Sequence, residues 1–332
     1  MFLKRAAALM AAFLMIIHLC GCGAEKEQER MVFAMDTVMT MRLYGGDEEL
    51  MKSLESRIKE LEGLFSVTDE GSEIYELNHT GSTEISDDMV DLVTRGLELC
   101  EATGGALDLT VYPIVRAWGF TTGEYRVPDE DELRELAEKC SYEKINISGS
   151  MVSIDEGMEL DLGAVAKGYT ADVLTEMVKE AGVESALLDL GGNISLIGEK
   201  PGGGSWGVGV RDPFSEENIG VLRLGDCMAV TSGSYERNFE QNGRVYHHII
   251  DPDTGMPADS GLASVTIVGE EGTLCDGLST ALFVMGLEDG LDLWRRMDDF
   301  EAVFVTDEGE IFITEGLEGS FDSEHSYEVC RR

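Results

Sequence analysis

The chain passes from a predicted strand into a helix at Asp161-Leu162-Gly163-Ala164-Val165-Ala166-Lys167-Gly168. The helix is predicted over residues 170–181 and is closed by Gly182. Small residues let a ligand approach the backbone, and the helix N-terminus together with Lys167 supplies positive potential for a phosphate group. The spacing of a Walker phosphate loop is missing. A tight turn with a solvated lysine therefore remains an equally good interpretation.

Strands and helices are mixed on both sides of this turn. Apolar residues recur at helical spacing in residues 50–65 and 86–103, and Ser86 is a suitable N-cap for the second helix. Further helices are predicted over residues 129–140 and 278–285. Strands are predicted over residues 31–43, 186–190, 206–211, 220–224, 246–250 and 263–268, with a final hairpin from 302–306 and 311–314. Because strict strand–helix alternation is missing, the sequence predicts an α+β fold.

The composition restricts the classes of ligand. The chain has 332 residues, of which 43% are hydrophobic, so it can bury a sizeable core. Lys and Arg total 25 against 65 Asp and Glu, which gives a formal net charge of −40. A surface this acidic repels nucleic acid, so no nucleic-acid partner is expected. A phosphate-bearing ligand would need a metal ion or a locally basic pocket.

The first residues have the pattern of an export signal. Lys4 and Arg5 precede an apolar run over residues 6–17, which is too short to span a membrane. The sequence Leu19-Cys20-Gly21-Cys22 then matches a bacterial lipobox, so Cys22 is the predicted lipidation site. An ordinary secretory signal is the alternative interpretation.

This pattern divides the chain into three parts. Residues 1–21 are predicted to be a lipoprotein signal peptide, residues 22–30 a polar tether, and residues 31–332 one catalytic unit. The expected location is the extracytoplasmic face of the cell membrane, to which a lipid on Cys22 would anchor the protein.

Two adjacent histidines, His247 and His248, stand out in a chain that has five histidines in all. Neighbouring residues of a strand face opposite sides, so one member of the pair can face a given site. This argues against a two-histidine metal site and for a single general base. A structural histidine with a satisfied hydrogen bond is the alternative for each of them.

Asp276 and Thr280 lie four residues apart in a predicted helix and therefore share one face. A carboxylate and a hydroxyl suit a hard cation such as Mg²⁺, and substrate phosphates would complete its shell. The alternative is an aspartate that caps the start of its own helix.

In their order along the chain, several motifs closely resemble the FAD:protein FMN transferase family, the ApbE-type flavin transferases. They are Met35-Asp36-Thr37, residues 66–78, 104–120, 161–168, 189–193 and 207–213, Thr231-Ser232-Gly233, residues 248–255, Ser264-Val265-Thr266 and residues 276–280. The departures from the family pattern are Leu107, Leu109 and Tyr112, which concern pocket shape and not charge.

The resemblance implies a mixed α/β fold with a T-fold-like core, FAD as the donor substrate and Mg²⁺ as cofactor. It implies that the Ala164 carbonyl and the side chains of Asp276 and Thr280 hold the metal. His248 matches the family's histidine at the acceptor, and Asp251 is expected to orient its imidazole. The residues expected to contact FAD are Met35, Thr68, Ala106, Leu107, Asp108, Asp161, Lys167, His247 and Ile250.

The implied reaction is an attack by a Thr or Ser hydroxyl of an acceptor protein on the FMN-side phosphorus of FAD, with AMP as the leaving group. The acceptor is expected to be a membrane-associated electron-transfer subunit or an FMN-binding domain. It should be a separate chain, because no segment of the form D-x-x-[ST]-G-A-[ST] occurs in this sequence. Two alternatives remain open: an FAD pyrophosphatase, in which water replaces the hydroxyl, and a non-enzymatic flavin-binding lipoprotein.

Overall fold

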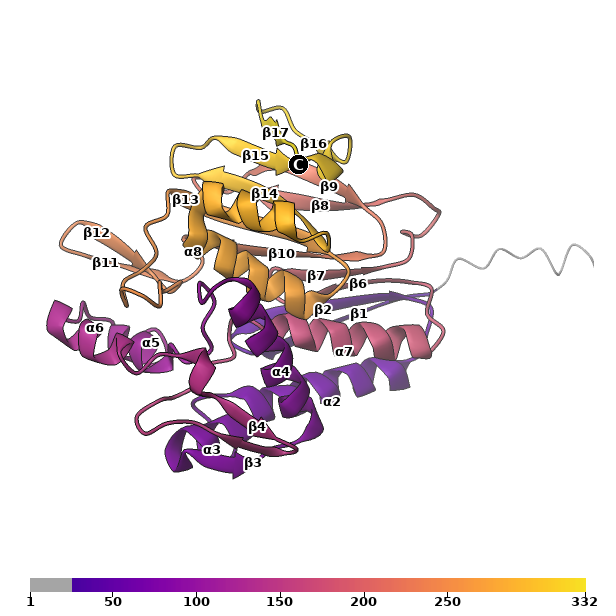
Figure 1. Cartoon of the computed structure of the whole chain (residues 1–332). Helices are drawn as coiled ribbons and strands as arrows, with labels where there is room; N and C mark the ends of the chain where they lie inside the picture. Colours follow the sequence, from indigo (N-terminus) through magenta and orange to yellow (C-terminus); the bar gives the residue numbers. More distant parts are fainter. Residues whose placement is uncertain (1–25) are drawn as a thin grey trace, which may run out of the picture.

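A nine-stranded sheet runs through the computed structural model, which describes residues 26–332 (Figure 1). Neighbouring strands are antiparallel except for β15 and β17, which are parallel. In spatial order the strands are β1 (Glu27–Ala34), β2 (Thr37–Tyr44), β6 (Ser185–Asp189), β7 (Asn193–Ile197), β10 (Cys227–Gly233), β13 (Leu262–Gly269), β14 (Phe300–Thr306), β15 (Ile311–Thr314) and β17 (Glu328–Cys330).

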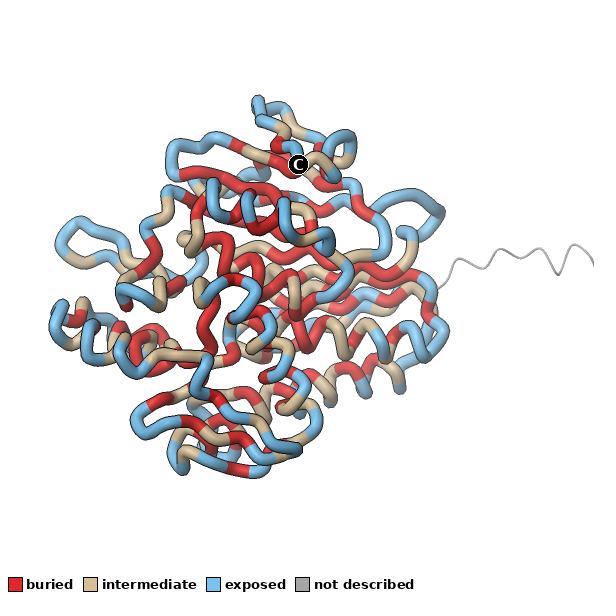
Figure 2. Tube along the Cα trace, in the orientation of Figure 1, coloured by how far each residue is buried: buried red, intermediate tan, exposed pale blue. Residues whose placement is uncertain are grey.

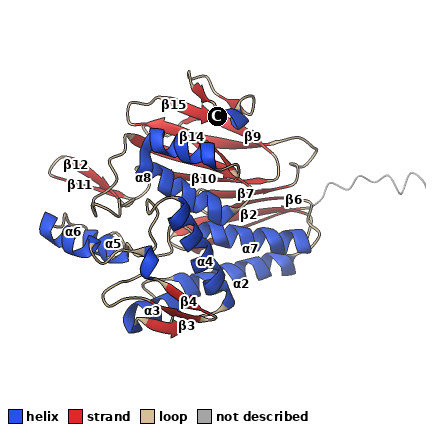
Figure 3. Ribbon diagram, in the orientation of Figure 1, coloured by secondary structure: helices blue, strands red, loops and turns tan. Residues whose placement is uncertain are grey.

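Helices cover one face of this sheet, and a small second sheet packs on the other (Figures 1 and 3). The covering helices are α2 (Glu48–Phe65), α4 (Asp87–Ala102), α7 (Ala166–Glu180) and α8 (Gly272–Arg296). The second sheet consists of β8 (Trp206–Arg211), β9 (Asn218–Leu224) and β16 (Phe321–Asp322). The buried segments are concentrated where these layers meet (Figure 2). The sequence prediction of an α+β fold is confirmed.

Smaller elements extend from this layered body. They are α3 (Glu73–Thr80), α5 (Tyr112–Trp118), α6 (Glu130–Ala137), a three-stranded sheet of β3 (Ser82–Glu84), β5 (Met151–Ser153) and β4 (Asn146–Ser148), and a hairpin of β11 (Asn238–Gln241) and β12 (Arg244–His247). Two 3-10 turns occur at Tyr142–Lys144 and Glu315–Leu317.

The predicted helices form where their apolar stripes can be buried. Helix α2 buries the stripe Met51, Leu54, Ile58, Leu61 and Phe65, and Asp47 accepts a hydrogen bond from the Leu50 amide at its start. Helix α4 begins after Ser86, whose hydroxyl accepts from the Met89 amide, as predicted. Periodicity thus predicted both helices, and the predicted cap of α4 at Ser86 is confirmed.

The N-terminal segment differs from the prediction in two ways. The first strand begins at Glu27, so residues 27–30 of the predicted tether belong to the sheet. The single strand predicted over residues 31–43 is a hairpin of β1 and β2 that turns at Met35 and Asp36. Strand β1 lies at the sheet edge, where alternate charged residues face solvent and Arg30 pairs with Glu55 at 2.8 Å. Because residues 27–30 of this edge strand are polar and charged, their composition resembles that of a linker, which is why the sequence predicted a tether there.

Three other boundaries change how the candidate site is built. Helix α7 begins at Ala166 and not at 170, which places Lys167 in its first turn. Strand β12 ends at His247, so the strand predicted over residues 246–250 stops short of His248. Helix α8 is far longer than the predicted 278–285 and breaks at Gly286, which has a φ of +82°.

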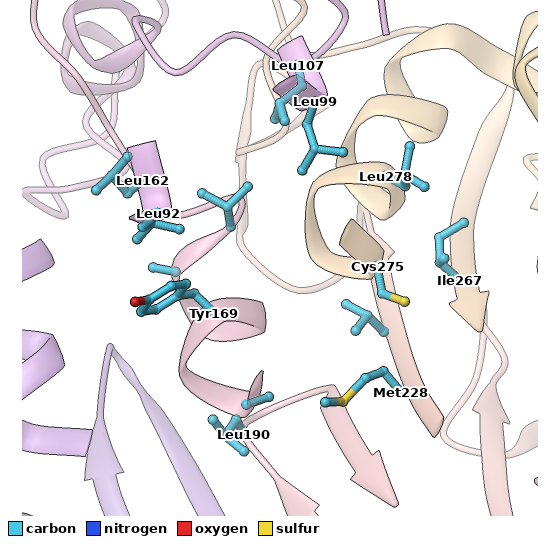
Figure 4. Packing of buried hydrophobic residues seen from close by; sticks show 14 of the residues in the cluster. Leu92, Leu99, Leu107, Leu162, Tyr169, Leu190, Met228, Ile267, Cys275 and Leu278 are labelled. Atoms are coloured by element: carbon cyan, nitrogen blue, oxygen red, sulfur yellow. The ribbon is translucent and has the colours of Figure 1, made fainter. Parts of the chain in front are cut away.

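Helices α7 and α8 cross at unusually close range. A Cβ on Gly168 would lie 2.2 Å from the Gly272 carbonyl oxygen and 2.7 Å from the Asp276 Cβ. The Asp172 carboxylate of α7 accepts from the Thr273 amide at 3.0 Å and from its hydroxyl at 2.7 Å, which caps the start of α8. Beyond the crossing, Cys275 and Leu278 of α8 pack toward Ile267 and Met228 of the sheet (Figure 4).

We expect Gly168→Ala to lower the free energy of unfolding by about 1–3 kcal/mol, because the new methyl group overlaps backbone and must separate the two helices. Denaturant titration of the purified domain measures this. Gly63→Ala is the matched control, since Gly63 lies in α2 with open space at its Cβ position and alanine favours a helix. Equal stability of the two variants would contradict the close crossing.

Candidate active site

The candidate site is built where the start of α7 meets α8 and the beginning of β7. The Gly168 backbone N–H of α7 donates to the Asp276 Oδ2 atom of α8 at 2.8 Å. One residue earlier, the Lys167 ammonium donates to Asn193 Oδ1 of β7 at 3.0 Å. The structure therefore brings the predicted phosphate-binding lysine and the predicted metal-binding aspartate to one place, although 109 positions separate their numbers.

Asp276 is a buried carboxylate. Burial raises the pKa of Asp276 above its ordinary value, and the nearby Lys167 ammonium opposes that rise. Within residues 26–332, no Lys, Arg or His side chain forms a salt bridge with it. A buried carboxylate without an ion-pair partner is costly, and a bound cation would relieve that cost.

The Ala164 carbonyl is available to the same cation. Ala164 precedes Val165, the N-cap residue of α7, and the first hydrogen bond of the helix runs from the Tyr169 amide to the Val165 carbonyl. The Gly168 N–H is one of the first-turn donors without a partner inside the helix, and it donates to Asp276. No donor in the described part of the chain contacts the Ala164 oxygen, which is therefore free to act as a hard oxygen ligand beside Asp276.

Thr280 completes a set of three oxygen groups, one turn along α8 from Asp276. Oxygen ligands of this kind fit Mg²⁺. Across residues 26–332, no cluster of three or more His, Cys, Asp or Glu side chains could hold a metal by itself. The three groups therefore fit a cation whose remaining ligands come from water or from substrate phosphates.

The β1–β2 turn approaches the same region. Met35 and Asp36 adopt left-handed φ values of +48° and +57°, and the Met35 amide donates to Glu62 at 2.6 Å. The Thr170 hydroxyl of α7 contacts the Met35 sulfur at 3.8 Å, which places Met35 beside the start of that helix. A Cβ on Gly191 would lie 2.2 Å from the Thr37 hydroxyl, so glycine is needed where this hairpin meets the loop 190–192.

His248 is held as a neutral base. Burial, together with the positive charge of Arg237, lowers the pKa of His248 to about 3. Its backbone N–H donates to the Arg237 carbonyl at 3.0 Å, and its Nδ1 atom is buried without a hydrogen-bond partner in the described chain. The Phe120 ring lies edge-on to the imidazole. An imidazole that is unprotonated at neutral pH can accept a proton from a hydroxyl group.

His247 has a structural role. Its Nε2 atom lies 3.0 Å from the Ala258 carbonyl oxygen, to which it donates, and its ring meets Phe283 edge-on. Burial lowers the pKa of His247 as well. The two neighbouring histidines thus lie in different surroundings, and a turn and not a strand places His248.

Asp251 does not orient His248, which corrects the expectation for this residue. Its carboxylate accepts from the Asp253 amide and from the Thr254 hydroxyl, each at 2.9 Å, and so closes the turn that follows. Asp108 is used in a similar way, since it accepts from the amide and the hydroxyl of Thr110 and from the Tyr142 amide. The Asp251 carboxylate is thus occupied by donors two and three residues further along the chain, and the Asp108 carboxylate by Thr110 and by the more distant Tyr142 amide.

The other residues expected to contact FAD lie in different surroundings. The Leu107 side chain is buried in the core beside Leu99, and its backbone N–H donates to the Thr103 hydroxyl at 3.2 Å (Figure 4). Ala106 lines a cavity of about 830 Å³ together with Asp251. Thr68 is exposed and lies 3.3 Å from the Ser66 hydroxyl. Ile250 is buried and pairs with Pro257.

Asp161 is half-buried, and it organises the turn before α7. Its carboxylate accepts from the Gly163 amide at 2.8 Å, and its own amide donates to the Leu109 carbonyl. Burial raises the pKa of Asp161, and Arg237 opposes this shift. Asp161 therefore fixes the turn that contains Ala164. Like His248, it lies within range of the positive charge of Arg237.

The sequence prediction missed two charged residues, Glu236 and Arg237. Arg237 lies 3.7 Å from Asp36 across the β1–β2 turn and lowers the pKa of His248 by its charge. Loss of solvent around the Glu236 carboxyl raises its pKa. The positive charge of Lys167 opposes this rise, and the negative charge of Asp276 adds to it. A charged pair in a polar loop carries no periodicity, so nothing local distinguished it from a solvated surface.

Fold and site together define a class of protein: an α+β chain with a site suited to a phosphate-bearing ligand and a hard cation. A family model described as the ApbE family matches residues 35–304, and the chain belongs to this family.

Known relatives and solved structures cover most of the chain. An FAD:protein FMN transferase of Klebsiella pneumoniae is 33% identical over 84% of this chain and 89% of its own length. One of Treponema pallidum is 33% identical over 91% and 92%, respectively. The crystal structure of the ApbE protein of Thermotoga maritima has a TM-score of 0.83 at 30% identity and covers 89% of this chain and 99% of its own. The flavin transferase ApbE of Vibrio cholerae gives 0.81 at 27% identity, with 89% and 99% covered.

The lowered pKa of His248 predicts a dependence of stability on pH. The unfolded chain protonates this histidine near its ordinary pKa of about 6.5, while the folded chain resists until about pH 3. Stability is therefore lost as the pH falls from about 6.5 toward 3, by an amount on the order of 1–2 kcal/mol at pH 5. Denaturant titrations at pH 7.5 and pH 5 measure this loss, which should be smaller in His248→Gln.

The matched control is His325→Gln at an exposed position, which should keep the wild-type loss between the two pH values. An unchanged loss in His248→Gln would show that other groups cause the acid sensitivity.

Proposed function

We propose that this protein transfers FMN from FAD to a Thr or Ser hydroxyl of an acceptor protein and releases AMP, in a reaction that depends on Mg²⁺. Membership of the ApbE family and the similarity to FAD:protein FMN transferases support the activity. The observation within the site that carries the proposal is the bond from Gly168 to Asp276, with Lys167 beside it. A helix N-terminus, a lysine and a buried carboxylate suited to a cation lie around one point, and these are groups that bind a pyrophosphate together with its metal ion.

The residues at the start of α7 and on α8 divide the binding of a pyrophosphate between them. Lys167 supplies fixed positive charge and is held in place by Asn193. The Ala164 carbonyl and the side chains of Asp276 and Thr280 would hold Mg²⁺, which would neutralise charge on the phosphates and on the departing AMP. Because both α7 and α8 are packed into the core, these groups need little reorganisation before the reaction.

His248 is the proposed proton acceptor for the attacking hydroxyl. It is neutral over the physiological range because of its burial and its cationic neighbour Arg237. Asp251 has no part in this step, since its carboxylate closes the turn 251–254. Transfer to a protein hydroxyl requires the acceptor side chain to displace water next to His248. If water attacks the phosphorus instead, the protein acts as a pyrophosphatase.

The proposal includes a lipid anchor and a separate acceptor chain at the membrane. The lipobox at Cys22 supports the anchor, and this residue lies outside the described part of the chain. From residue 26 onward, no helix combines the length and the apolar character that crossing a membrane requires. The proposed acceptor is a membrane-associated electron-transfer subunit or an FMN-binding domain on the extracytoplasmic side.

Mass spectrometry of an acceptor domain tests the proposed activity. The chain from residue 26 onward is incubated with FAD, Mg²⁺ and a flavin-accepting domain, and the acceptor should gain the mass of one FMN while AMP appears in equal amount. AMP without a mass gain would identify a pyrophosphatase, and bound FAD without AMP would identify a flavin-binding protein. Either result would overturn the proposed transferase activity.

We expect Asp276→Asn to reduce transfer by at least about 100-fold, because the substitution removes the one negative charge among the three proposed ligands and so weakens binding of a divalent cation. The amide oxygen can still accept the Gly168 N–H, so the fold should persist, as circular dichroism and the unfolding midpoint will show. Transfer rates as a function of Mg²⁺ concentration measure the effect. Wild-type rates at the same Mg²⁺ concentration would refute the assignment of Asp276.

We expect His248→Ala to slow transfer by about 100-fold or more while FAD binding stays within a few-fold of wild type, because general-base assistance acts on the chemical step. Single-turnover kinetics give the rate, and quenching of flavin fluorescence gives the affinity for FAD. A parallel fall of rate and affinity would instead make His248 a wall of the binding pocket.

A further inference from the structure

Three hydroxyl groups lie in a row between strand β10 and helix α8. The Ser232 Oγ atom of β10 is 2.7 Å from the Ser279 Oγ atom and 3.4 Å from the Thr280 Oγ1 atom, both on α8. Ser279 is fully buried, and its hydroxyl donates to the Asp276 carbonyl oxygen at 2.8 Å. The row therefore links the Thr280 hydroxyl to the backbone of Asp276, the residue whose side chain is proposed to hold the same cation.

The end of this row fixes the direction of each of its hydrogen bonds. A hydroxyl has one proton to donate and two lone pairs to accept with. A carbonyl oxygen can only accept, so the proton of Ser279 is committed to Asp276. Ser232 must then donate to Ser279, and its own oxygen can only accept from Thr280. The Thr280 proton therefore points toward Ser232.

This direction decides what Thr280 presents to the site. With its proton turned toward Ser232, the Thr280 oxygen directs its lone pairs away from β10 and can serve as a ligand for a cation. A threonine whose hydroxyl was free to rotate would spend part of the time with its proton toward the cation. Groups that orient a metal ligand in this way contribute roughly 10–100-fold to metal affinity in characterised sites.

We infer that Ser232 is a positioning residue that sets the Thr280 hydroxyl as a cation ligand, and that Ser279 fixes the direction of the relay. The inference rests on the proposed function, because that function places the cation at Thr280. It assigns a purpose to Ser232, which lies in the Thr231-Ser232-Gly233 motif and touches neither of the charged groups, Lys167 and Asp276, in the hydrogen bonds of the described chain.

Another hydroxyl pair in the same core supplies a matched control. Ser195 of β7 is fully buried and pairs with Thr175 of α7 at 2.7 Å, the same kind of bond as that between Ser232 and Ser279. This pair makes no contact with Thr280 in the described hydrogen bonds. Ser195→Ala thus removes a buried serine hydroxyl without touching the relay.

The test measures binding of Mn²⁺, as a probe for Mg²⁺, from the electron paramagnetic resonance signal of the free ion in the presence of saturating FAD and without acceptor. We expect Ser232→Ala to weaken Mn²⁺ binding by roughly 10-fold, and Ser232→Thr, which keeps the hydroxyl, to restore it. Ser195→Ala should bind Mn²⁺ like the wild type. The unfolding midpoint without metal should fall by similar amounts in the two alanine variants.

The outcomes separate this inference from the proposed function. If wild-type protein binds Mn²⁺ and Ser232→Ala binds it equally well, the positioning role is wrong while the cation site stands. If Ser195→Ala weakens Mn²⁺ binding as much as Ser232→Ala does, the effect is one of general packing and the role of Ser232 is also wrong. If the wild type takes up no Mn²⁺ with FAD, the proposed cation site itself is wrong.

Discussion

The hydrogen bond from the Gly168 amide to Asp276 is the interaction on which the site depends. It exists because α7 and α8 cross at a pair of glycines, Gly168 and Gly272, where no side chain keeps the backbones apart. Asp172 fixes the same crossing from one turn further along α7 by capping the first residues of α8. Two aspartates thus join the helices at opposite ends of one contact.

This bond has two effects on the site. It stabilises a carboxylate that burial would otherwise destabilise, and it places that carboxylate against the start of α7. The Ala164 carbonyl, which precedes the N-cap residue Val165, accepts no hydrogen bond in the described part of the chain and presents a free oxygen at the same helix start. The close packing of the two helices and the position of the carboxylate therefore follow from one constraint, which explains why glycine is needed in the first turn of each helix.

The sequence predicted the parts of the protein that local rules determine. The apolar stripe and cap of α4, the final hairpin and a helix start close to Lys167 were all readable, because periodicity and turn residues act over a few positions. The strand predicted before that helix is reduced to an isolated bridge between Val111 and Glu159. The pairing of Lys167 with Asn193 was not readable, since it depends on the order of strands in the sheet. Asp251 was misassigned because its neighbours satisfied it locally, and Arg237 was overlooked because its importance comes entirely from tertiary position.

The charge of the chain supports the proposal that the site uses a cation in addition to a lysine. The chain carries a formal net charge of −40, so at long range it repels a ligand that bears a pyrophosphate. At 0.15 M salt this repulsion is screened beyond roughly 8 Å, and binding then depends on the few positive groups at short range. Among these, the Lys167 ammonium already donates a hydrogen bond to Asn193. The charge of Arg237 is partly compensated by Asp36, which lies close to it. An acidic surface raises the local concentration of divalent cations, and Asp276 gives one a place to bind. A pyrophosphate whose two negative charges are neutralised by Mg²⁺ no longer meets this repulsion, so the charge of the whole chain, and not three ligands alone, supports the proposed metal dependence.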